Sequence, residues 1–353
     1  MTVTLQQAKP LALTQLGLYQ FAIDLDKPLP VGKQRIEQRS GLVLVAQTEE
    51  RQEWVEISPL CGVDNQGEII TGFSQESLEE VSQQLLTILP QLQQQPIDCL
   101  LEHAEQSTQP SLAYGLSLMH AKLMGKLDGH SLTARTVPLI YRQADEPLSL
   151  VASRVNALPE TTLAVKVKVA QDSLEDELQL IHQILAIRPK LKLRLDANRG
   201  FSLEQAIEFA ACVPLESIEY IEEPCQNPQD NCTFYQAIEM PWALDESLNH
   251  PDYQFEMLPG LRALLIKPTL FGSLEKLQQL IDTAAEHGVR TILSSSLEAS
   301  LGIEAISRLA QIFTPDETPG IDTLGAFNQD LLVSSGKDHC LKLAALTPLF
   351  ILK

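Results

Sequence analysis

The chain has 353 residues and carries 46 Asp and Glu against 26 Lys and Arg, which gives a formal net charge of −20 at pH 7. Nucleic acids and anionic membrane surfaces are bound through clustered Lys and Arg, so we expect neither as a partner. A single hydrophobic core rarely grows beyond about 250–300 residues, and the length therefore predicts a second domain.

The N-terminal region, residues 1–105, has the pattern of an α+β unit. Its first residues lack the basic start and apolar stretch of a secretory signal, so we expect a cytoplasmic protein. A helix is predicted to begin after Ser74 as N-cap, and the polar stretch 91–96 is a candidate linker. Apolar alternation predicts an antiparallel meander at 17–23, 41–46 and 54–57.

Residues 106–330 have the pattern of an α/β barrel, beginning with a helix predicted at 111–127. The glycine-rich first turn of a doubly wound sheet is missing. We therefore predict a (β/α)8 barrel behind the α+β unit, with a tail, 331–353, that is long enough to return to the N-terminal domain. Helical segments, several opening with a Ser cap, separate eight apolar runs at 137–141, 163–169, 191–196, 217–222, 242–245, 263–267, 290–295 and 320–323.

Core strands of a parallel barrel should be almost wholly apolar, but five of these runs carry a charge near the C-terminal end. These charged residues are separated by steps of 28, 26, 23 and 22 residues, each about one βα unit. They therefore occupy equivalent places on successive strands, at the rim where barrels gather catalytic groups. The five are Lys168, Asp196, Glu222, Asp245 and Lys267.

Lys166 and Lys168 are two residues apart and therefore project from the same face of one strand. Taken alone, such a pair is most often a solvated edge. Inside a barrel, two partly buried ammonium groups lower the pKa of each other, so that a neutral amine base becomes accessible near pH 7.

Asp196, Glu222 and Asp245 would repel one another unless a cation neutralised them. Three hard oxygen ligands suit Mg²⁺. The cysteines show no CxxC spacing and the histidines no paired spacing, so a zinc site is not expected. Glu223 points away from Glu222 on the strand and is expected to hold a neighbouring cation instead.

Lys267 lies on the sixth strand, across the barrel from the paired lysines. It is either a partner for the surplus carboxylates or a second base or cation that stabilises a developing enolate. Cations on both sides of a metal favour removal of the proton α to a carboxylate.

At these residues the chain resembles the enolase superfamily, and within it the o-succinylbenzoate synthases of menaquinone biosynthesis. Residues 61–71 are a departure, because close relatives have a very short link there. The motifs that carry the resemblance are Trp54-Val-Glu-Ile-Ser-Pro-Leu60, Gly72-Phe-Ser-Gln-Glu76, Lys166-Val-Lys168, Leu193-Arg-Leu-Asp-Ala-Asn-Arg199, Ile221-Glu-Glu-Pro-Cys225, Leu244-Asp-Glu-Ser-Leu248, Ile266-Lys-Pro-Thr-Leu270, Gly272-Ser-Leu-Glu-Lys276, Ser294-Ser-Ser-Leu-Glu-Ala-Ser-Leu-Gly302 and Pro319-Gly-Ile-Asp-Thr-Leu324.

The resemblance implies a modified (β/α)8 TIM-like barrel behind an N-terminal α+β capping domain, with the C-terminal tail packed on the cap. It also implies a syn dehydration of a small dicarboxylate substrate. We expect a monomer or weak homo-oligomer. Lys168 would take the proton and then help hydroxide to leave, while Lys267 stabilises the enolate from the opposite face and Lys166 contacts the carboxylate. Mg²⁺ would be held by Asp196, Glu222 and Asp245. The expected substrate contacts are Arg194 and Asn198 beside the metal, and Ser295 and Ser296 at the succinyl tail, although a turn cap explains these serines as well.

The same lysines would also serve an N-acylamino-acid racemase or a dipeptide epimerase. Dipeptide epimerases typically carry an Asp-x-Asp on the eighth strand, whereas Ile321-Asp-Thr-Leu324 has one Asp. This difference favours the synthase. A barrel that has lost catalysis and only binds is the alternative from another class, but none of the expected ligands or lysines is substituted.

Overall fold

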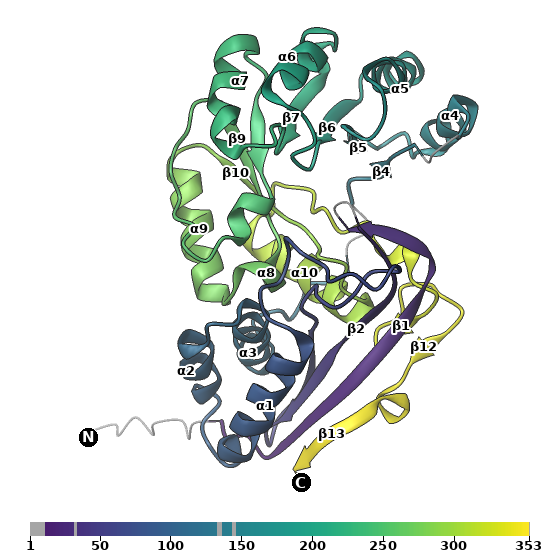
Figure 1. The fold of residues 1–353 in the computed structure, drawn as a ribbon. Helices are drawn as coiled ribbons and strands as arrows, with labels where there is room; N and C mark the ends of the chain where they lie inside the picture. Colours follow the sequence, from purple (N-terminus) through teal and green to yellow (C-terminus); the bar gives the residue numbers. More distant parts are fainter. Residues whose placement is uncertain (1–10, 32–33, 133–135, 143–145, 353) are drawn as a thin grey trace.

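The computed structural model describes residues 11–31, 34–132, 136–142 and 146–352. Its first layer is an antiparallel sheet of β1 (Gln15–Val31), β2 (Gln34–Gln47) and β3 (Gln52–Ile57), with β13 (Thr347–Leu352) paired along the outer edge of β1. The end of the described chain therefore lies beside its beginning, as Figure 1 shows.

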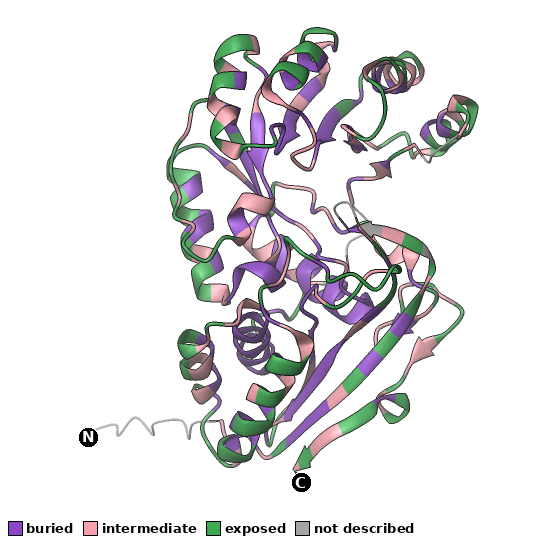
Figure 2. Cartoon of the chain, viewed as in Figure 1, coloured by how far each residue is buried: buried purple, intermediate pink, exposed green. Residues whose placement is uncertain are grey.

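Three helices, α1 (Leu78–Leu92), α2 (Cys99–Gln106) and α3 (Pro110–Leu123), follow the meander. Every residue of α3 from Ser111 to Leu123 is buried, because this helix packs against α2, β3 and the barrel helix α8 (Pro268–Phe271). The packing is close: a Cβ on Gly115 would lie 2.4 Å from Ile57, so only glycine fits here. Figure 2 shows this helix as a buried element that joins the cap to the barrel.

The prediction that Ser74 caps α1 is wrong. Ser77 is the N-cap, because it forms a capping box: the amide of Glu80 donates to Ser77 Oγ at 3.2 Å, and the Ser77 amide donates to Glu80 Oε2 at 2.7 Å. Ser74 Oγ instead accepts a bond from the amide of Leu60. The polar stretch 91–96 is not a linker between domains, since α1 continues to Leu92 and residues 94–97 bond to residues 11–13.

The second layer is a curled parallel sheet in the order β10-β9-β8-β7-β6-β5-β4. Seven of the eight predicted runs form its strands, which confirms the α/β class. The strands are β4 (Leu139–Ile140), β5 (Ala164–Lys168), β6 (Lys192–Asp196), β7 (Ile218–Glu222), β8 (Trp242–Leu244), β9 (Leu261–Ile266) and β10 (Arg290–Leu293).

Helices cover the outer face of this sheet (Figure 1). Ser173, Ser202 and Ser273 cap three of them, as the sequence predicts. No helix in the described part of the chain is long and apolar enough to cross a membrane. The outer helices are α4 (Leu148–Ala157), α5 (Leu174–Ile187), α6 (Leu203–Ala211), α7 (Asn231–Ile238), α9 (Leu274–Glu286) and α10 (Ser300–Phe313).

The prediction of an eighth strand at 320–323 is wrong, because the described residues of that segment form no strand. Gly320 makes a single parallel bridge to Ser294. Pro319 has no amide hydrogen to extend the ladder, and the chain turns at Ile321 and enters a short 3₁₀ helix at Leu324. The sheet is therefore a seven-stranded half-barrel with one bridged segment at its β10 edge.

Candidate active site

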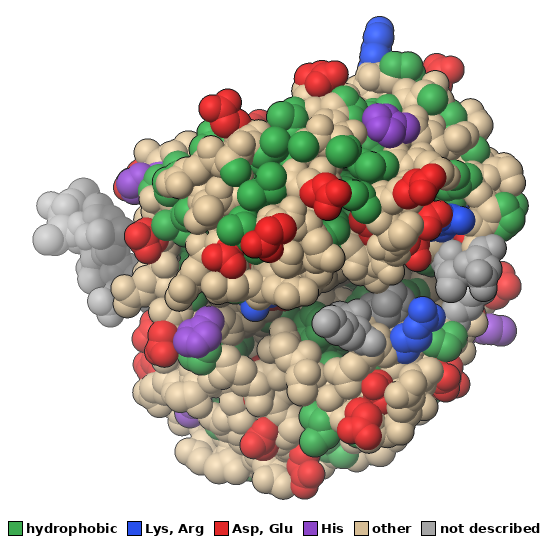
Figure 3. Space-filling view, turned by 45° about the horizontal axis from the view of Figure 1, so that its top comes forward, with side chains coloured by type: hydrophobic (Ala, Val, Ile, Leu, Met, Phe, Trp, Pro, Cys, Tyr) green, Lys and Arg blue, Asp and Glu red, His purple; other side chains and the backbone are tan. Residues whose placement is uncertain are grey.

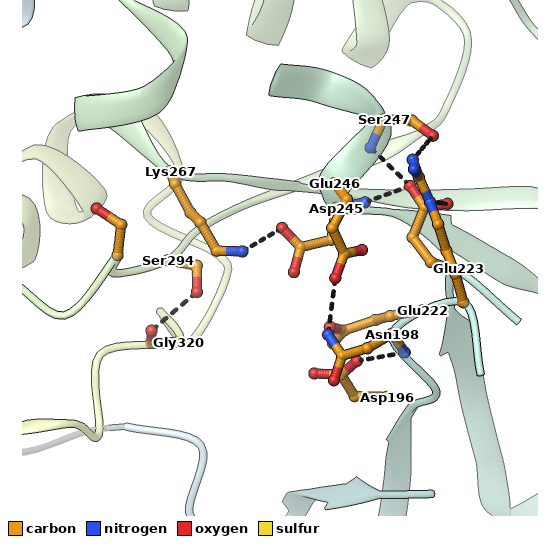
Figure 4. A network of polar contacts seen from close by, with 12 residues as sticks. Asp196, Asn198, Glu222, Glu223, Asp245, Glu246, Ser247, Lys267, Ser294 and Gly320 are labelled. Atoms are coloured by element: carbon orange, nitrogen blue, oxygen red, sulfur yellow. Dashed lines mark hydrogen bonds and ion pairs between the residues drawn. The ribbon is translucent and has the colours of Figure 1, made fainter. Parts of the chain in front are cut away.

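The charged residues expected at the strand ends lie together at the C-terminal edge of the parallel sheet. Lys168 stands in register with Asp196, and Asp196 in turn with Glu222. Asp245 directly follows β8, and Lys267 directly follows β9. Figure 4 shows that the carboxylates form one group, with the Lys267 amine turned toward it.

Ion pairs connect the three lysines to the three carboxylates. Lys166 Nζ lies 2.7 Å from Asp196 Oδ2 and 2.5 Å from Glu222 Oε2. Lys168 Nζ lies 2.7 Å from the same Asp196 oxygen, and Lys267 Nζ lies 2.5 Å from Asp245 Oδ1. The three carboxylates are buried, whereas the side chains of Lys166 and Lys168 remain 23% and 27% exposed.

The expectation of a lowered lysine pKa is wrong for Lys166 in this arrangement. Burial lowers the pKa of Lys166, but the charges of Asp196, Glu222 and Asp245 outweigh burial and hold it well above the ordinary value. Lys267 behaves in the same way: burial lowers its pKa, and the charges of Asp245 and Glu246 more than compensate. Carboxylates, rather than the other ammonium group, dominate the surroundings of each lysine.

Glu246 is a fourth carboxylate in the group, which the sequence patterns did not single out. Strand alternation would point it away from Asp245, but β8 ends at Leu244 and the chain turns into a 3₁₀ helix at Glu246. Its Oε1 accepts a bond from Asn198 Nδ2 at 2.7 Å, while its Oε2 is shielded from solvent and receives no bond from any described residue. The Asp-Glu-Ser sequence after the strand was the available signal.

The donor set fits a hard divalent cation. Four carboxylates face three ammonium groups, and one of the buried carboxylate oxygens has no partner. Burial, with Asp196 and Asp245 adding to it, keeps the pKa of Glu222 above its ordinary value although Lys166 opposes the shift. In the described part of the chain no three such side chains already converge as a metal cluster, because Lys166 Nζ lies between Asp196 and Glu222.

Glu223 lies behind the group and holds a cation, as the sequence predicts. Arg199 Nε lies 3.2 Å from Glu223 Oε2. The backbone amides of Asp245 and Ser247 donate to Glu223 Oε1 at 3.2 and 2.9 Å. Glu223 therefore fixes the turn from which Asp245 projects.

Of the two residues expected beside the metal, the structure brings only Asn198 into the group. Asn198 Oδ1 accepts a bond from Lys168 Nζ at 2.5 Å. The partners found for Arg194 lie elsewhere: its Nε bonds Glu219 Oε2 at 2.8 Å, and its guanidinium lies over the Tyr220 ring. Arg194 precedes Asp196 by two residues and so lies one layer deeper, which is why it meets these groups instead.

Ser295 and Ser296 are buried near the bridged segment. Ser295 Oγ pairs with Thr323 Oγ1 at 3.1 Å. Ser296 donates both its hydroxyl and its amide to Glu298, each at 2.7 Å, so the carboxylate of Glu298 is the acceptor in this turn. Ser294 Oγ donates to Gly320 O on the Lys267 side of the group (Figure 4).

The cap contacts the barrel through Arg39 of β2, which is buried. Its guanidinium donates to the carbonyls of Ser58 and Pro59 in the cap, at 2.5 and 2.8 Å, and to that of Leu297 in the barrel, at 3.0 Å. The extra loop 61–71 is tied to the first hairpin, because Gln34 Nε2 donates to Ile69 O at 2.8 Å. Figure 3 shows a groove that runs between the barrel and the cap.

Comparisons with known proteins match both parts of the chain. A family model described as "Enolase C-terminal domain-like" matches residues 151–336, and one described as "MenC, N-terminal domain" matches residues 13–123. The o-succinylbenzoate synthase of Klebsiella pneumoniae (strain 342) is 35% identical over 320 residues, which cover 89% of this chain and 92% of that protein.

Two solved structures share the fold. The o-succinylbenzoate synthase from Thermosynechococcus elongatus BP-1, complexed with Mg in its active site, has a TM-score of 0.65 at 22% identity, covering 87% of this chain and 92% of that chain. The dipeptide epimerase from Cytophaga hutchinsonii, complexed with Mg and a dipeptide, has a TM-score of 0.70 at 19% identity, covering 90% and 89%.

Proposed function

Because the chain belongs to the o-succinylbenzoate synthase family of the enolase superfamily, we propose that it dehydrates 2-succinyl-6-hydroxy-2,4-cyclohexadiene-1-carboxylate to 2-succinylbenzoate. The chain is thus an enzyme of the carbon–oxygen lyase class. The observation that carries the proposal is the group of three lysines and four carboxylates at adjoining strand ends.

Asp196, Glu222 and Asp245 would hold Mg²⁺, which when bound makes the proton α to the ring carboxylate more acidic by drawing off developing negative charge. Their burial and the surplus of carboxylate over ammonium support this assignment. Lys166, which pairs with two of the three, would contact the substrate carboxylate.

In the proposed reaction Lys168 reacts as the neutral amine, and its Nζ removes the α-proton from the ring carbon. The electron pair of that C–H bond forms a new C=C bond, and the C–OH bond breaks on the neighbouring carbon. Lys168 then returns the proton to the leaving hydroxide, so that water departs from the face that lost the proton. The product ring is aromatic, which makes the elimination strongly favourable.

Lys267 would stabilise the negative charge that develops during proton removal. It pairs with Asp245, whereas Lys168 pairs with Asp196. Its ammonium therefore stands on the other side of the carboxylate group, where it can face the charge without competing for the proton.

Amino-acid racemisation is the second candidate, because lysines on two sides of a substrate can act as two bases. The shared fold with a dipeptide epimerase is compatible with it. The single Asp322 in the bridged segment, where epimerases typically carry two, favours dehydration.

The experiment that separates the two is a comparison of kcat/KM for the cyclohexadiene substrate and for N-succinyl amino acids. We expect kcat/KM for the cyclohexadiene to be higher by at least about 100-fold, because a site that is complementary to the transition state of dehydration stabilises that of racemisation less well. A preference for racemisation would transfer the function to the second candidate. Menaquinone biosynthesis, a cytoplasmic location and a monomer or weak homo-oligomer complete the proposal, and they rest on the family.

A further inference from the structure

Glu246 has no role in the reaction proposed above, yet it bonds the side chain that contacts Lys168. Asn198 Nδ2 donates to Glu246 Oε1 at 2.7 Å, as Figure 4 shows. The other end of the same amide, Asn198 Oδ1, accepts from Lys168 Nζ at 2.5 Å. One amide thus connects a carboxylate to the proposed catalytic amine.

The chemistry of these three groups allows only one orientation of the amide. An ammonium group has three donors and no acceptor, and Glu246 Oε1 accepts from the Asn198 amide nitrogen. The Asn198 amide must therefore turn its oxygen to Lys168 and its nitrogen to Glu246. Lys168 and Glu246 thus hold the amide from its two ends, and without Glu246 only the bond from Lys168 would hold it.

The backbone of Asn198 is already fixed, which leaves the side-chain amide as the part that needs holding. Asn198 has φ 43°, in the left-handed region, and its own amide donates to Asp196 Oδ1 at 3.2 Å. These features place the residue but do not choose between the two orientations of its amide.

We propose that Glu246 is a positioning residue, which fixes the amide of Asn198 and through it the orientation of the Lys168 amine. Besides its bond to carbon, the nitrogen of Lys168 has three sites, each of which holds either a hydrogen or a lone pair. Asp196 Oδ2 and Asn198 Oδ1 take two of them. The third is left for the proton exchanged with the substrate. This inference rests on the proposed function, because it assigns a purpose to the orientation of Lys168.

The test compares Glu246→Ala with Glu246→Gln. Glutamine retains an oxygen that accepts from Asn198 Nδ2, whereas alanine removes it. We expect kcat to fall about 10- to 100-fold in the alanine variant, with KM changed less than about 3-fold, and glutamine to recover most of the loss. Asp252→Ala, which removes an exposed carboxylate that follows the same 3₁₀ helix, is the matched control and should behave as wild type.

Wild-type turnover is measured first, since its absence would refute the proposed function rather than this inference. If wild type is active, unchanged kcat in Glu246→Ala overturns the inference. Equal losses in the alanine and glutamine variants also overturn it, because the charge and not the acceptor would then matter. The Mg²⁺ concentration for half-activation should be the same in all three proteins; a rise confined to the two variants would assign Glu246 to the cation site instead.

Discussion

Replacement of Lys168 should lower the catalytic rate and leave the stability of the fold unchanged. Without Lys168, Asp196 keeps its ion pair with Lys166, so the buried carboxylate is not left unpaired. We expect Lys168→Ala to lower kcat by at least about 1,000-fold, within the range of a lost general acid–base group. The midpoint of thermal unfolding should stay close to that of wild type. Lys190→Ala, which removes an exposed lysine just before β6, is the control for loss of charge.

Glu56 gives a second prediction at the same scale, which concerns pH and stability. Its Oε1 accepts from Ser58 Oγ and the Ala299 amide, and its Oε2 accepts from the Gly302 amide at the start of α10. Burial raises the pKa of Glu56 to about 6, from 4.5. The native state therefore binds a proton more readily than the unfolded chain, and the contribution of this group to stability is present below pH 4.5 and is lost as pH rises through about 6.

The free energy of unfolding of wild type, relative to Glu56→Gln, should accordingly fall by about 1 kcal/mol between pH ~5 and pH ~7.5, since each unit of pKa shift is worth about 1.4 kcal/mol. Glutamine cannot titrate, so the difference isolates Glu56. Denaturant unfolding of the two proteins at both pH values measures it. If the difference in free energy of unfolding between the two proteins is constant, or grows with pH, then burial does not raise the pKa of Glu56.

At the scale of elements, salt bridges between side chains hold the edge of the half-barrel together, whereas backbone pairing between strands holds the rest of the sheet. Arg290 forms a bidentate salt bridge with Glu317, at 2.6 and 2.8 Å. Glu317 lies just before the bridged segment. Arg194 and Arg290 both bond Glu219 Oε2, at 2.8 and 3.2 Å. These contacts attach the segment that replaces the eighth strand to β6, β7 and β10.

The position of Arg194 in this network predicts a structural effect. We expect Arg194→Met to lower the free energy of unfolding by about 3 kcal/mol, as removal of one partner from a buried ion pair does. KM for the substrate should change less than about 2-fold. Denaturant titration and steady-state kinetics check the two statements. An increased KM with unchanged stability would return Arg194 to the substrate contacts that the family resemblance implies.

Elements whose signals are local could be predicted from sequence. The seven apolar runs and the caps at Ser173, Ser202 and Ser273 depend on neighbours within a few residues. Ser74 and Ser77 compete three residues apart, and only the reciprocal bond to Glu80 decides between them. The placement of Arg194 could not be predicted, because Glu219 and Glu317 lie 25 and 123 residues further along the chain.

The candidate site, too, could be predicted from the sequence only where its signals follow a regular pattern. The spacing of the lysines and of the three carboxylates indicated one shared edge, because parallel strands repeat the same geometry. Glu246 was missed because the alternation rule holds only within a strand, and β8 ends two residues before it. The actual partners of Ser296 depend on the turn at Glu298, which no alternation pattern describes.

For the whole molecule, the net charge of −20 does not describe the site. The group at the strand ends contains one more carboxylate than lysine, so a bound divalent cation would bring its formal charge, with every group counted as ionised, from −1 to +1. An anionic dicarboxylate would then meet a locally positive site in an acidic protein, which favours binding.

The most direct test is the rate of dehydration of the cyclohexadiene substrate by the purified protein, before and after chelation of divalent metal and on titration with Mg²⁺. We expect chelation to reduce the rate by at least about 100-fold, because the buried carboxylates would then face the substrate without the cation that offsets them. Added Mg²⁺ should restore the rate. Absence of turnover at every Mg²⁺ concentration, or turnover that chelation leaves unchanged, would contradict the account.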